Sequence, residues 1–385
     1  MSDATFVGSE ATVREISQQP DVWREAASNI AAEQAAIDAF LEPLLALDDL
    51  RIVLTGAGTS AFIGEIAAPA LSRLLGRRVE AVATTDIVSN PRDAFAEDIP
   101  TLLVSFARSG NSPESTAATA LADQSLTSVG HLILTCDASG ALFAQHHGRP
   151  GSRTVLMPAR SNDEGFAMTS SFTSMLLSAL LILGGPDDTA VEAVATAASR
   201  ILDERQDSIR ALAGAGCERV VYIGSGSLTG LARESALKLL ELTAGAVVTY
   251  YDSALGFRHG PKAALDDSTL VVVYVSADPY TKLYDLDIVT ELRATLPPER
   301  VVVISPEPLP DADESWVLSE LAGVDDAFLA AAYVVVAQLL GLSFSLGLGA
   351  TPDNPFPGGT VNRVVQGVRI HPVASPPVGG PGRSR

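Results

Sequence analysis

Basic residues are scarce in this chain of 385 residues. It carries 26 Lys and Arg against 46 Asp and Glu, a formal net charge of −20 at pH 7. A surface this acidic repels nucleic acid and anionic membranes, so we expect no polyanionic partner. A small phosphorylated ligand is still compatible with it, because backbone N–H groups and hydroxyls can bind a phosphate locally.

Cysteine is also scarce: Cys136 and Cys217 are the only two, and neither belongs to a Cys-x-x-Cys or Cys/His cluster. We therefore expect no metal site and no disulfide framework. The N-terminus, 1–13, lacks the apolar core of a signal peptide. The uncharged run 327–352 is long enough to span a membrane. It contains Gln338 and has no flanking basic residues, so we expect a buried core helix in a cytoplasmic protein.

The rest of the chain alternates strand and helix patterns. After a helical N-terminal segment rich in Ala, Glu and Leu, short β-rich runs are separated by helical patterns. These runs lie at 51–55, 101–105, 131–135 and 154–157. The alternation predicts an α/β fold in which helices cover both faces of a doubly wound parallel sheet.

The second half repeats the first at a fixed offset. Residues 53–58 (VLTGAG) match 221–226 (VYIGSG), a shift of 168 residues that also aligns the next two buried strands with 271–273 and 301–303. We therefore predict an internal duplication. The predicted units are an N-terminal helical segment (1–48), a first module (49–205), a second module (206–350) and a C-terminal tail (351–385). We expect the end of the tail, 374–385, to be disordered.

The loop 56–60 (GAGTS) joins a predicted strand to a helix. Gly58 permits a tight turn, the helix N-terminus offers free N–H groups, and Thr59 and Ser60 add hydroxyls, so an anion is the expected ligand. Two other interpretations stay open. The hydroxyls could only cap the helix. Alternatively, Gly-x-Gly-x-x-Ala with Glu80 as a ribose ligand fits a relaxed dinucleotide fingerprint, which predicts a nicotinamide-dependent oxidoreductase.

A second loop, 105–115, follows the next buried strand and is rich in hydrogen-bond donors. The donors around Gly110 are Ser105, Arg108, Ser109, Asn111 and Ser112. A phosphate monoester uses such a cluster, whereas a pyrophosphate on a helix N-terminus does not. Capping of a helix that begins at Pro113 explains one serine but not the whole cluster.

A third constellation lies in the second half. Glu234, Lys238 and Glu241 are spaced i, i+4 and i+7 on a predicted helix and so share one face over roughly 10 Å. A solvated face with ordinary ion pairs is the alternative. However, Lys238 and Lys262 are two of only three lysines, and His259 lies nearby in a Gly/Pro-framed loop. Carboxylate, imidazole and amine are the groups that proton transfer next to a carbonyl requires.

These motifs resemble the sugar isomerase (SIS) superfamily over nearly the whole chain. The two donor-rich loops resemble the sugar-phosphate loops of a first SIS module. The Glu-x-x-x-Lys-x-x-Glu helix and His259-Gly-Pro resemble the isomerase half of glucosamine-6-phosphate synthase. Longer phrases are similar to the bacterial galactosamine-6-phosphate deaminase/isomerase group, also known as tagatose-6-phosphate ketose/aldose isomerases. These phrases are 15–20 (EISQQP), 86–91 (DIVSNP), 166–173 (FAMTSSFT), 251–261 (YDSALGFRHGP) and 353–355 (DNP).

The resemblance implies roles for the residues above. Glu241 would move a proton between C1 and C2, His259 would assist ring opening, and Lys238 and Glu234 would orient the substrate and tune Glu241. Thr59, Ser60, Ser109 and Ser112 would hold the phosphate. The remaining substrate-binding candidates are Gly58, Ser105, Arg108, Asn111, Thr169 and Asn362.

Two departures from the synthase limit the transfer. Its glutaminase domain has no counterpart in this sequence, and its C-terminal-tail lysine has none in 360–369. Asn362 or Arg363 is therefore expected to contribute from the tail instead. In the synthase the equivalent of His259 comes from a neighbouring subunit, which implies a homodimer with a shared active site.

The resemblance predicts an amino-sugar phosphate deaminase/isomerase that converts galactosamine 6-phosphate to tagatose 6-phosphate and ammonia. An enediol or enolamine route needs only acid–base groups, so we expect neither cofactor nor metal. Three alternatives stay open. They are a hexose-phosphate ketose/aldose isomerase at the same site, a sugar-phosphate-binding SIS protein without turnover, and the oxidoreductase.

Overall fold

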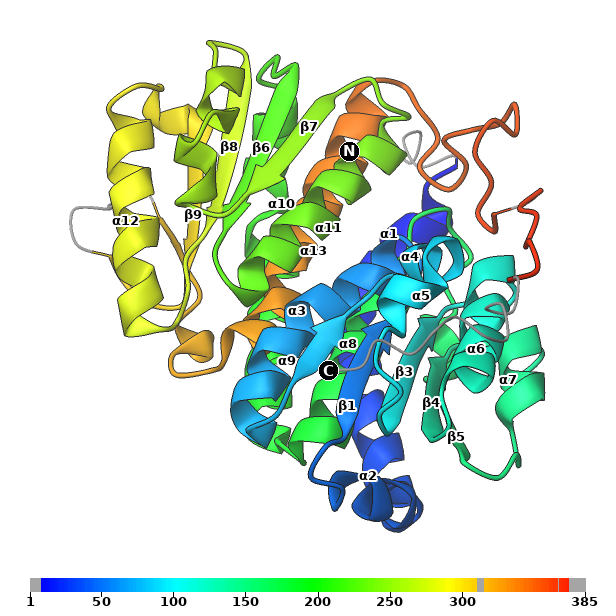
Figure 1. Ribbon diagram of the computed structural model, residues 1–385. Coiled ribbons are helices and arrows are strands. Elements are labelled where there is room, and N and C mark those ends of the chain that lie inside the picture. Colours follow the sequence, from blue (N-terminus) through cyan, green and yellow to red (C-terminus); the bar gives the residue numbers. More distant parts are fainter. Residues whose placement is uncertain (1–7, 310–314, 366, 374–385) are drawn as a thin grey trace.

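The computed structural model describes residues 8–309, 315–365 and 367–373. It contains two five-stranded parallel sheets, one in each half of the chain (Figure 1). The front sheet has the order β2-β1-β3-β4-β5, with bounds β1 Arg51–Thr55, β2 Val79–Ala81, β3 Thr101–Ala107, β4 Val129–Thr135 and β5 Ser152–Leu156. The rear sheet has the order β7-β6-β8-β9-β10, with bounds β6 Arg219–Gly224, β7 Val248–Asp252, β8 Thr269–Tyr274, β9 Val301–Ser305 and β10 Trp316–Val317. The strands therefore follow the same order in both sheets, and the predicted α/β fold with two modules is confirmed.

Helices cover both faces of each sheet, because the connections between parallel strands must cross over. The front module contains α3 Thr59–Leu75, α4 Thr84–Ser89, α5 Pro91–Ala94, α6 Pro113–Ser125, α7 Ala141–His146 and α8 Ser170–Gly184. The rear module contains α11 Ser227–Leu242, α12 Pro279–Arg293 and α13 Asp326–Gly347. The remaining helices are α1 Glu10–Ser17, α2 Gln19–Leu45, α9 Asp188–Glu204 and α10 Gln206–Ala213.

One hydrophobic core runs through both modules. It extends from Ile16 in α1 to Phe344 in α13 and includes buried residues of both sheets. Helices α3 and α11 pack against each other in this core, and α11 also packs against α13. The ends of α3 and α11 are therefore fixed relative to one another, which matters for the site below. The predicted unit boundaries stay predictions, and the segment 374–385 lies outside the described residues.

The long apolar helix α13 belongs to this core. By length and composition it could cross a membrane, but 89% of its apolar window is buried inside the protein. The buried Gln338 on it receives a hydrogen bond from Gln19 in α2 at 2.7 Å, so its polar group is satisfied. This agrees with the predicted core helix.

The two glycine turns that start α3 and α11 have matching backbones. Gly58 has φ 56° and ψ −128°, and Gly226 has φ 59° and ψ −127°. This positive φ strongly favours glycine. At Gly56 the constraint is close approach instead, since a Cβ there would lie 2.6 Å from the backbone of Ser60. The glycines therefore allow the strand to turn directly into a helix whose N-terminus faces the carboxyl edge of the sheet.

Candidate active site

A buried ammonium lies where the two modules meet. Lys238 in α11 is 0% exposed, and its Nζ donates to the Oγ1 of Thr59 at 2.9 Å. Thr59 is the first residue of α3 in the other module. The same Nζ donates to Glu241 Oε2 at 2.6 Å and lies 3.4 Å from Glu234 Oε1. The first donor-rich loop and the Glu–Lys–Glu face therefore meet in one cluster, which we call the Lys238 cluster (Glu234, Lys238, Glu241 and Thr59).

The charges of the Lys238 cluster are set by burial. The pKa of Glu234 is raised to about 8, mainly because the side chain is completely buried. The charge of Lys238 lowers this pKa, and the charge of Glu241 raises it further. Burial lowers the pKa of Lys238, but the carboxylates of Glu234 and Glu241 outweigh this effect and raise it above its ordinary value. At neutral pH Lys238 is therefore an ammonium, and Glu234 is the group of the cluster that takes up a proton.

The two carboxyl groups differ in access. The Glu234 side chain is 0% exposed, whereas that of Glu241 is 25% exposed. Neither oxygen of Glu234 has a hydrogen-bond partner that meets normal geometry within the described chain. Glu241 is thus the carboxyl group of the cluster that a substrate can reach, and it is hydrogen-bonded to the Lys238 ammonium. This arrangement suits an acid–base group supported by a buried neighbour.

The front sheet ends in unpaired donors beside this cluster. Thr55, the last residue of β1, pairs with Ser105 in β3, two residues before that strand ends. The hydroxyls of both side chains and the Nη1 of Arg108 are buried without a hydrogen-bond partner among the described residues. Buried polar groups are normally satisfied, so three such donors near one edge indicate a ligand.

The second loop is held in shape by its own hydrogen bonds. Ser109 Oγ accepts from the backbone N–H of Asn111 at 3.3 Å, and Asn111 Oδ1 accepts from the N–H of Ala141 at 3.0 Å. Ser112 Oγ lies 2.6 Å from Ser115 Oγ. Gly110 has a φ of 64°, a conformation that favours glycine, and at this residue the loop packs against α7. Part of the predicted donor cluster is therefore used to build the loop itself.

Electrostatics connect this loop to the acid–base helix. Burial lowers the pKa of Arg108, and the charge of Arg363 lowers it further, while Asp163, Cys136 and Glu241 act in the opposite direction. Arg108 is therefore close enough to feel the charge of Glu241. A phosphate held by the donors of the front loop would therefore lie within electrostatic range of the carboxylate of the rear helix.

The corresponding loops of the rear module are filled by the chain's own carboxylates. Asp285 accepts from Ser225 Oγ at 2.7 Å and from the N–H of Ser276 at 3.0 Å. Asp326 accepts from Ser276 Oγ at 2.5 Å and from the N–H of Ala277 at 2.7 Å. Burial raises the pKa of Asp285 to about 6. The donors that could hold an anion in the rear module are therefore occupied.

Three predicted site residues make no hydrogen bond or ion pair with the Lys238 cluster within the described part of the chain. His259 caps the short 3₁₀ turn Gly256–Arg258 and is exposed, with no polar partner in the described part of the chain. Thr169 is buried, and its hydroxyl donates to Asp163 at 3.2 Å. Asn362 is exposed, and its amide donates to the carbonyl of Gly359 at 3.4 Å. Ser60, by contrast, is buried beside Thr59, with Oγ 3.9 Å from Met168 Sδ.

Sequence reasoning missed two polar groups of this region. Asp163 is fully buried and accepts hydrogen bonds from the backbone and hydroxyls of Thr169 and Ser171, so it orders the start of α8. It lies six residues before Thr169, the N-cap residue of α8, which is too far for a helix-capping motif, so no local sequence signal marks this role. Thr55 was missed although it lies in the repeated motif 53–58, because its place at the end of a buried strand predicts packing rather than an unpaired hydroxyl.

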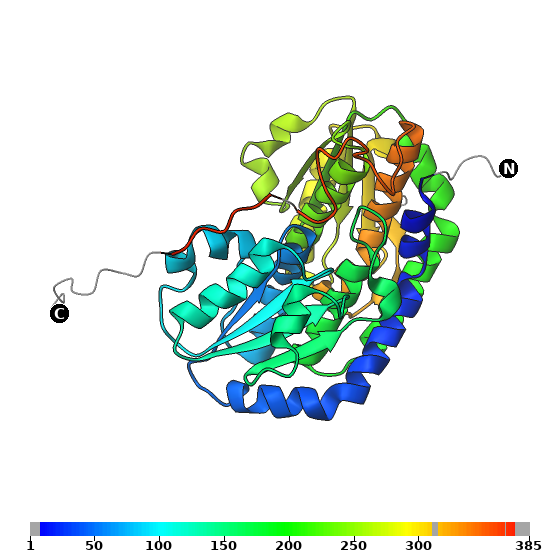
Figure 2. The same cartoon turned by 90° about the vertical axis from the view of Figure 1, so that its right-hand side faces the viewer.

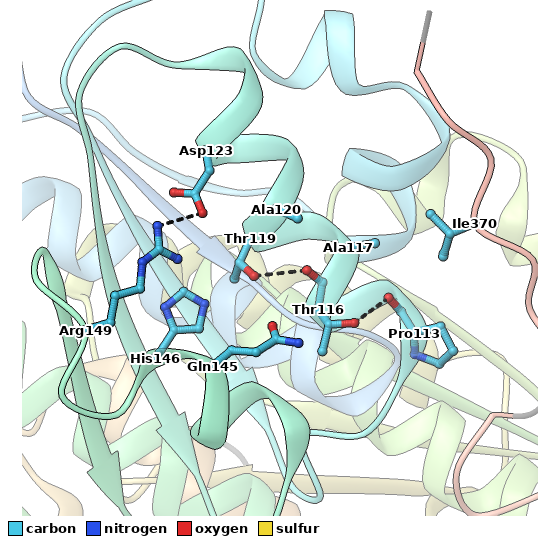
Figure 3. A pocket seen from close by; sticks show the side chains of 10 residues that line it. All are labelled: Pro113, Thr116, Ala117, Thr119, Ala120, Asp123, Gln145, His146, Arg149 and Ile370. Atoms are coloured by element: carbon cyan, nitrogen blue, oxygen red, sulfur yellow. Dashed lines mark hydrogen bonds and ion pairs between the residues drawn. The ribbon is translucent and has the colours of Figure 1, made fainter.

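A separate hollow of about 690 Å³ lies between α6 and α7 (Figure 3). Its polar side chains largely pair with each other: Asp123 accepts from Arg149 at 2.8 Å and lies 3.0 Å from His131 Nε2. Burial lowers the pKa of His146 in its wall to about 4. Ile370 of the C-terminal tail reaches this hollow. The hollow lacks the carboxylate and ammonium pair of the Lys238 cluster. Within the described residues, no group of three or more His, Cys, Asp and Glu could hold a metal ion.

The raised pKa of Glu234 predicts a specific loss of stability at alkaline pH. The folded chain holds the Glu234 proton up to about pH 8, whereas the unfolded chain loses it near 4.5. This contribution is complete below pH 4.5 and is lost as the pH rises through 8. In Glu234→Gln, the decline in unfolding free energy between pH 5 and 9 should be smaller by roughly 4 kcal/mol. Urea unfolding across this pH range measures it. The exposed Glu299→Gln should follow the wild type, and a Glu234→Gln profile parallel to wild type would contradict the assignment.

Comparison with known proteins places this geometry in a family. The SIS domain model matches residues 44–183 and 215–309, one segment in each predicted module. A relative from Streptomyces coelicolor is 56% identical over 365 residues, which cover 94% of this chain and 95% of that protein. The D-galactosamine-6-phosphate deaminase AgaS of Escherichia coli is 47% identical over 366 residues, covering 94% and 95%.

A solved structure agrees with this assignment. The crystal structure of tagatose-6-phosphate ketose/aldose isomerase from Escherichia coli has a TM-score of 0.89 and 44% identity, and the match covers 97% of this chain and 100% of that chain. The predicted resemblance is confirmed. The chain belongs to the SIS domain family.

Proposed function

We propose that this chain is an amino-sugar phosphate deaminase/isomerase that converts galactosamine 6-phosphate to tagatose 6-phosphate and ammonia. The observation that carries the proposal is the ammonium of Lys238, which bonds to Thr59 of the front loop and to the accessible Glu241 of the rear helix. The names of the deaminase and isomerase relatives support the same substrate class.

Proton transfer between C1 and C2 accounts for the reaction with these groups. Once the sugar ring is open, Glu241 takes the proton from C2, and the electrons of that C–H bond form a double bond between C1 and C2. The π electrons of the C1 carbonyl move to its oxygen, which takes up a proton from water, and the product is an enolamine. Glu241 then returns a proton to C1, which leaves an imine at C2. Water adds to C2, the C–N bond breaks, and ammonia leaves the ketose.

The Lys238 ammonium has an electrostatic part in this scheme. Its raised pKa keeps it charged, so it stabilises negative charge that develops on the C1 oxygen. A lysine that attacks a carbonyl needs the opposite shift, toward a free amine. Lys238 is therefore assigned to charge stabilisation and to holding Glu241, and Glu234 to tuning Glu241 from its buried position beside Lys238.

Ammonia release tests the reaction. Purified protein should release ammonia and tagatose 6-phosphate in equal amounts from galactosamine 6-phosphate. In Glu241→Gln, kcat should fall about 10³-fold while substrate binding persists, because the general base is lost but the phosphate donors stay. Exchange of the C2 proton in deuterated water should be lost with it.

Two results would contradict this assignment. Interconversion of a ketose and an aldose phosphate with no ammonia from any hexosamine phosphate would leave a plain isomerase at the same site. Tight binding with neither ammonia nor C2 exchange in the wild type would leave a sugar-phosphate-binding protein without turnover.

We further propose that the enzyme is a cytoplasmic homodimer in which His259 serves the active site of the partner. His259 is exposed and has no polar partner in the described part of its own chain. Strand β7 lies at the edge of the rear sheet, and Val248 in it is 56% exposed. Leu255, 46% exposed, precedes His259 by four residues. An edge strand with exposed apolar side chains is a favourable surface for a second copy.

Subunit complementation tests the shared site. Glu241→Gln and His259→Asn should each be nearly inactive alone. In a purified mixed dimer that carries one change in each subunit, one of the two sites has both wild-type residues, so activity should return to about half of the wild type. If His259 serves its own chain, both sites of the mixed dimer are damaged and the activity stays near zero.

A further inference from the structure

The C-terminal tail returns to the active site of the front module. Residues 351–365, which we call the tail strap, follow α13, and Figure 2 shows the tail in red passing from the rear module to the front module. Near its start, the Asp353 carboxylate accepts from the N–H groups of Ala11 and Thr12 at 3.1 and 2.8 Å. The ring of Phe356 lies 5.1 Å from that of Phe166. These contacts fix where the tail strap begins.

The tail strap then meets Arg108. The Nη2 of Arg108 donates to the backbone carbonyl of Arg363 at 3.1 Å. Arg108 is only 6% exposed, and its Nη1 is buried with no partner among the described residues. A guanidinium normally uses its donors as a fork on a carboxylate or phosphate, so Arg108 has one donor fixed on the tail strap and another unused.

The side chain of Arg363 adds a second positive charge at this point. It is exposed and makes no ion pair within the described chain, and its charge is near enough to lower the pKa of Arg108. The acids that act on Arg108 are Asp163 and Glu241, with the Cys136 thiol. Asp163 is already used by the start of α8, and Glu241 is bonded to Lys238. Neither is bonded to either guanidinium, and two adjacent cations repel each other unless an anion joins them.

We propose that Arg108 and Arg363 form a dibasic clamp for the phosphate of the substrate, with Arg363 as a residue that selects phosphorylated over unphosphorylated sugars. Arg108 directly follows β3, the strand that carries Ser105 and pairs with Thr55 of β1, so the clamp lies near the unpaired hydroxyls of these two residues. It supplies a local positive charge in a chain whose net charge is −20, where a phosphate dianion would otherwise be repelled. The identity of the sugar rests on the proposed function, but the recognition of phosphate does not.

The contact geometry separates this role from simple anchoring of the tail. Arg108 holds the tail strap through the backbone carbonyl of Arg363, which any residue at this position provides. A substitution of Arg363 therefore removes the second charge and keeps the anchor. Arg369, also exposed and on the same tail, is a matched control, because its replacement removes one positive charge without touching the Arg108 contact.

Arg363→Gln tests the clamp by kinetics and by binding. KM for galactosamine 6-phosphate should rise about tenfold with a smaller change in kcat, since one charge-assisted hydrogen bond to the phosphate is lost. In Arg363→Gln, the concentration of inorganic phosphate needed for a given rise in unfolding temperature should increase by a similar factor, measured at constant ionic strength. Arg363→Lys should restore part of both effects, and Arg369→Gln should behave as the wild type.

Three outcomes would overturn the clamp. One is that Arg363→Gln agrees with Arg369→Gln within about twofold in both KM and the stabilising phosphate concentration. Another is that inorganic phosphate does not stabilise even the wild type. If the wild type releases no ammonia from any hexosamine phosphate but the phosphate effects follow the expected pattern, the proposed function fails and the clamp stands. For unphosphorylated galactosamine, KM should be the same in Arg363→Gln as in the wild type. A rise in that KM equal to the rise for galactosamine 6-phosphate would also contradict the proposal.

Discussion

The buried ammonium of Lys238 is the interaction on which the architecture and the proposed chemistry both depend. Glu234 and Glu241 lie on the same helix as Lys238, with carboxyl oxygens 3.4 and 2.6 Å from its Nζ. Thr59, which accepts a hydrogen bond from the same Nζ, belongs to the other module. A fully buried charge is costly unless it is paired and hydrogen-bonded. The two modules must therefore dock in the orientation that brings α3 and α11 together. The same docking places the accessible carboxylate beside the loops with unpaired donors.

The two modules share one strand order but use their loops in opposite ways. In the front module, the buried hydroxyls of Thr55 and Ser105 have no partner among the described residues. In the rear module, the equivalent loops are closed by Asp285 and Asp326. A carboxylate and a phosphate compete for the same backbone and hydroxyl donors, so the rear loops are internally neutralised. This difference supports one sugar-phosphate site per chain, served by the acid–base helix of the rear module.

The fold was largely predictable from the sequence because its signals are local and periodic. The apolar runs at 51–55 and 101–105 coincide with β1 and most of β3. The matching glycine turns in the two halves of the chain indicated the second sheet. The Glu–Lys–Glu face was also visible from its spacing. Its burial was not, because the choice between a solvated face and a buried charge cluster depends on packing against α3 and α13, which are far away in sequence. The sequence named Asn362 and Arg363 as alternatives from the tail, and it could not show the contact of Arg363 with Arg108, which depends on how the tail crosses the molecule.

Removal of the Lys238 charge, with and without its buried partner, tests the central claim most directly. Lys238→Met should lower the urea unfolding free energy by about 3–5 kcal/mol, since it leaves a buried carboxyl group unpaired. The double variant Lys238→Met with Glu234→Gln should recover most of that stability and still release no ammonia. If Lys238→Met unfolds like the wild type and keeps its turnover, the buried ammonium holds neither the fold nor the chemistry, and the account is contradicted.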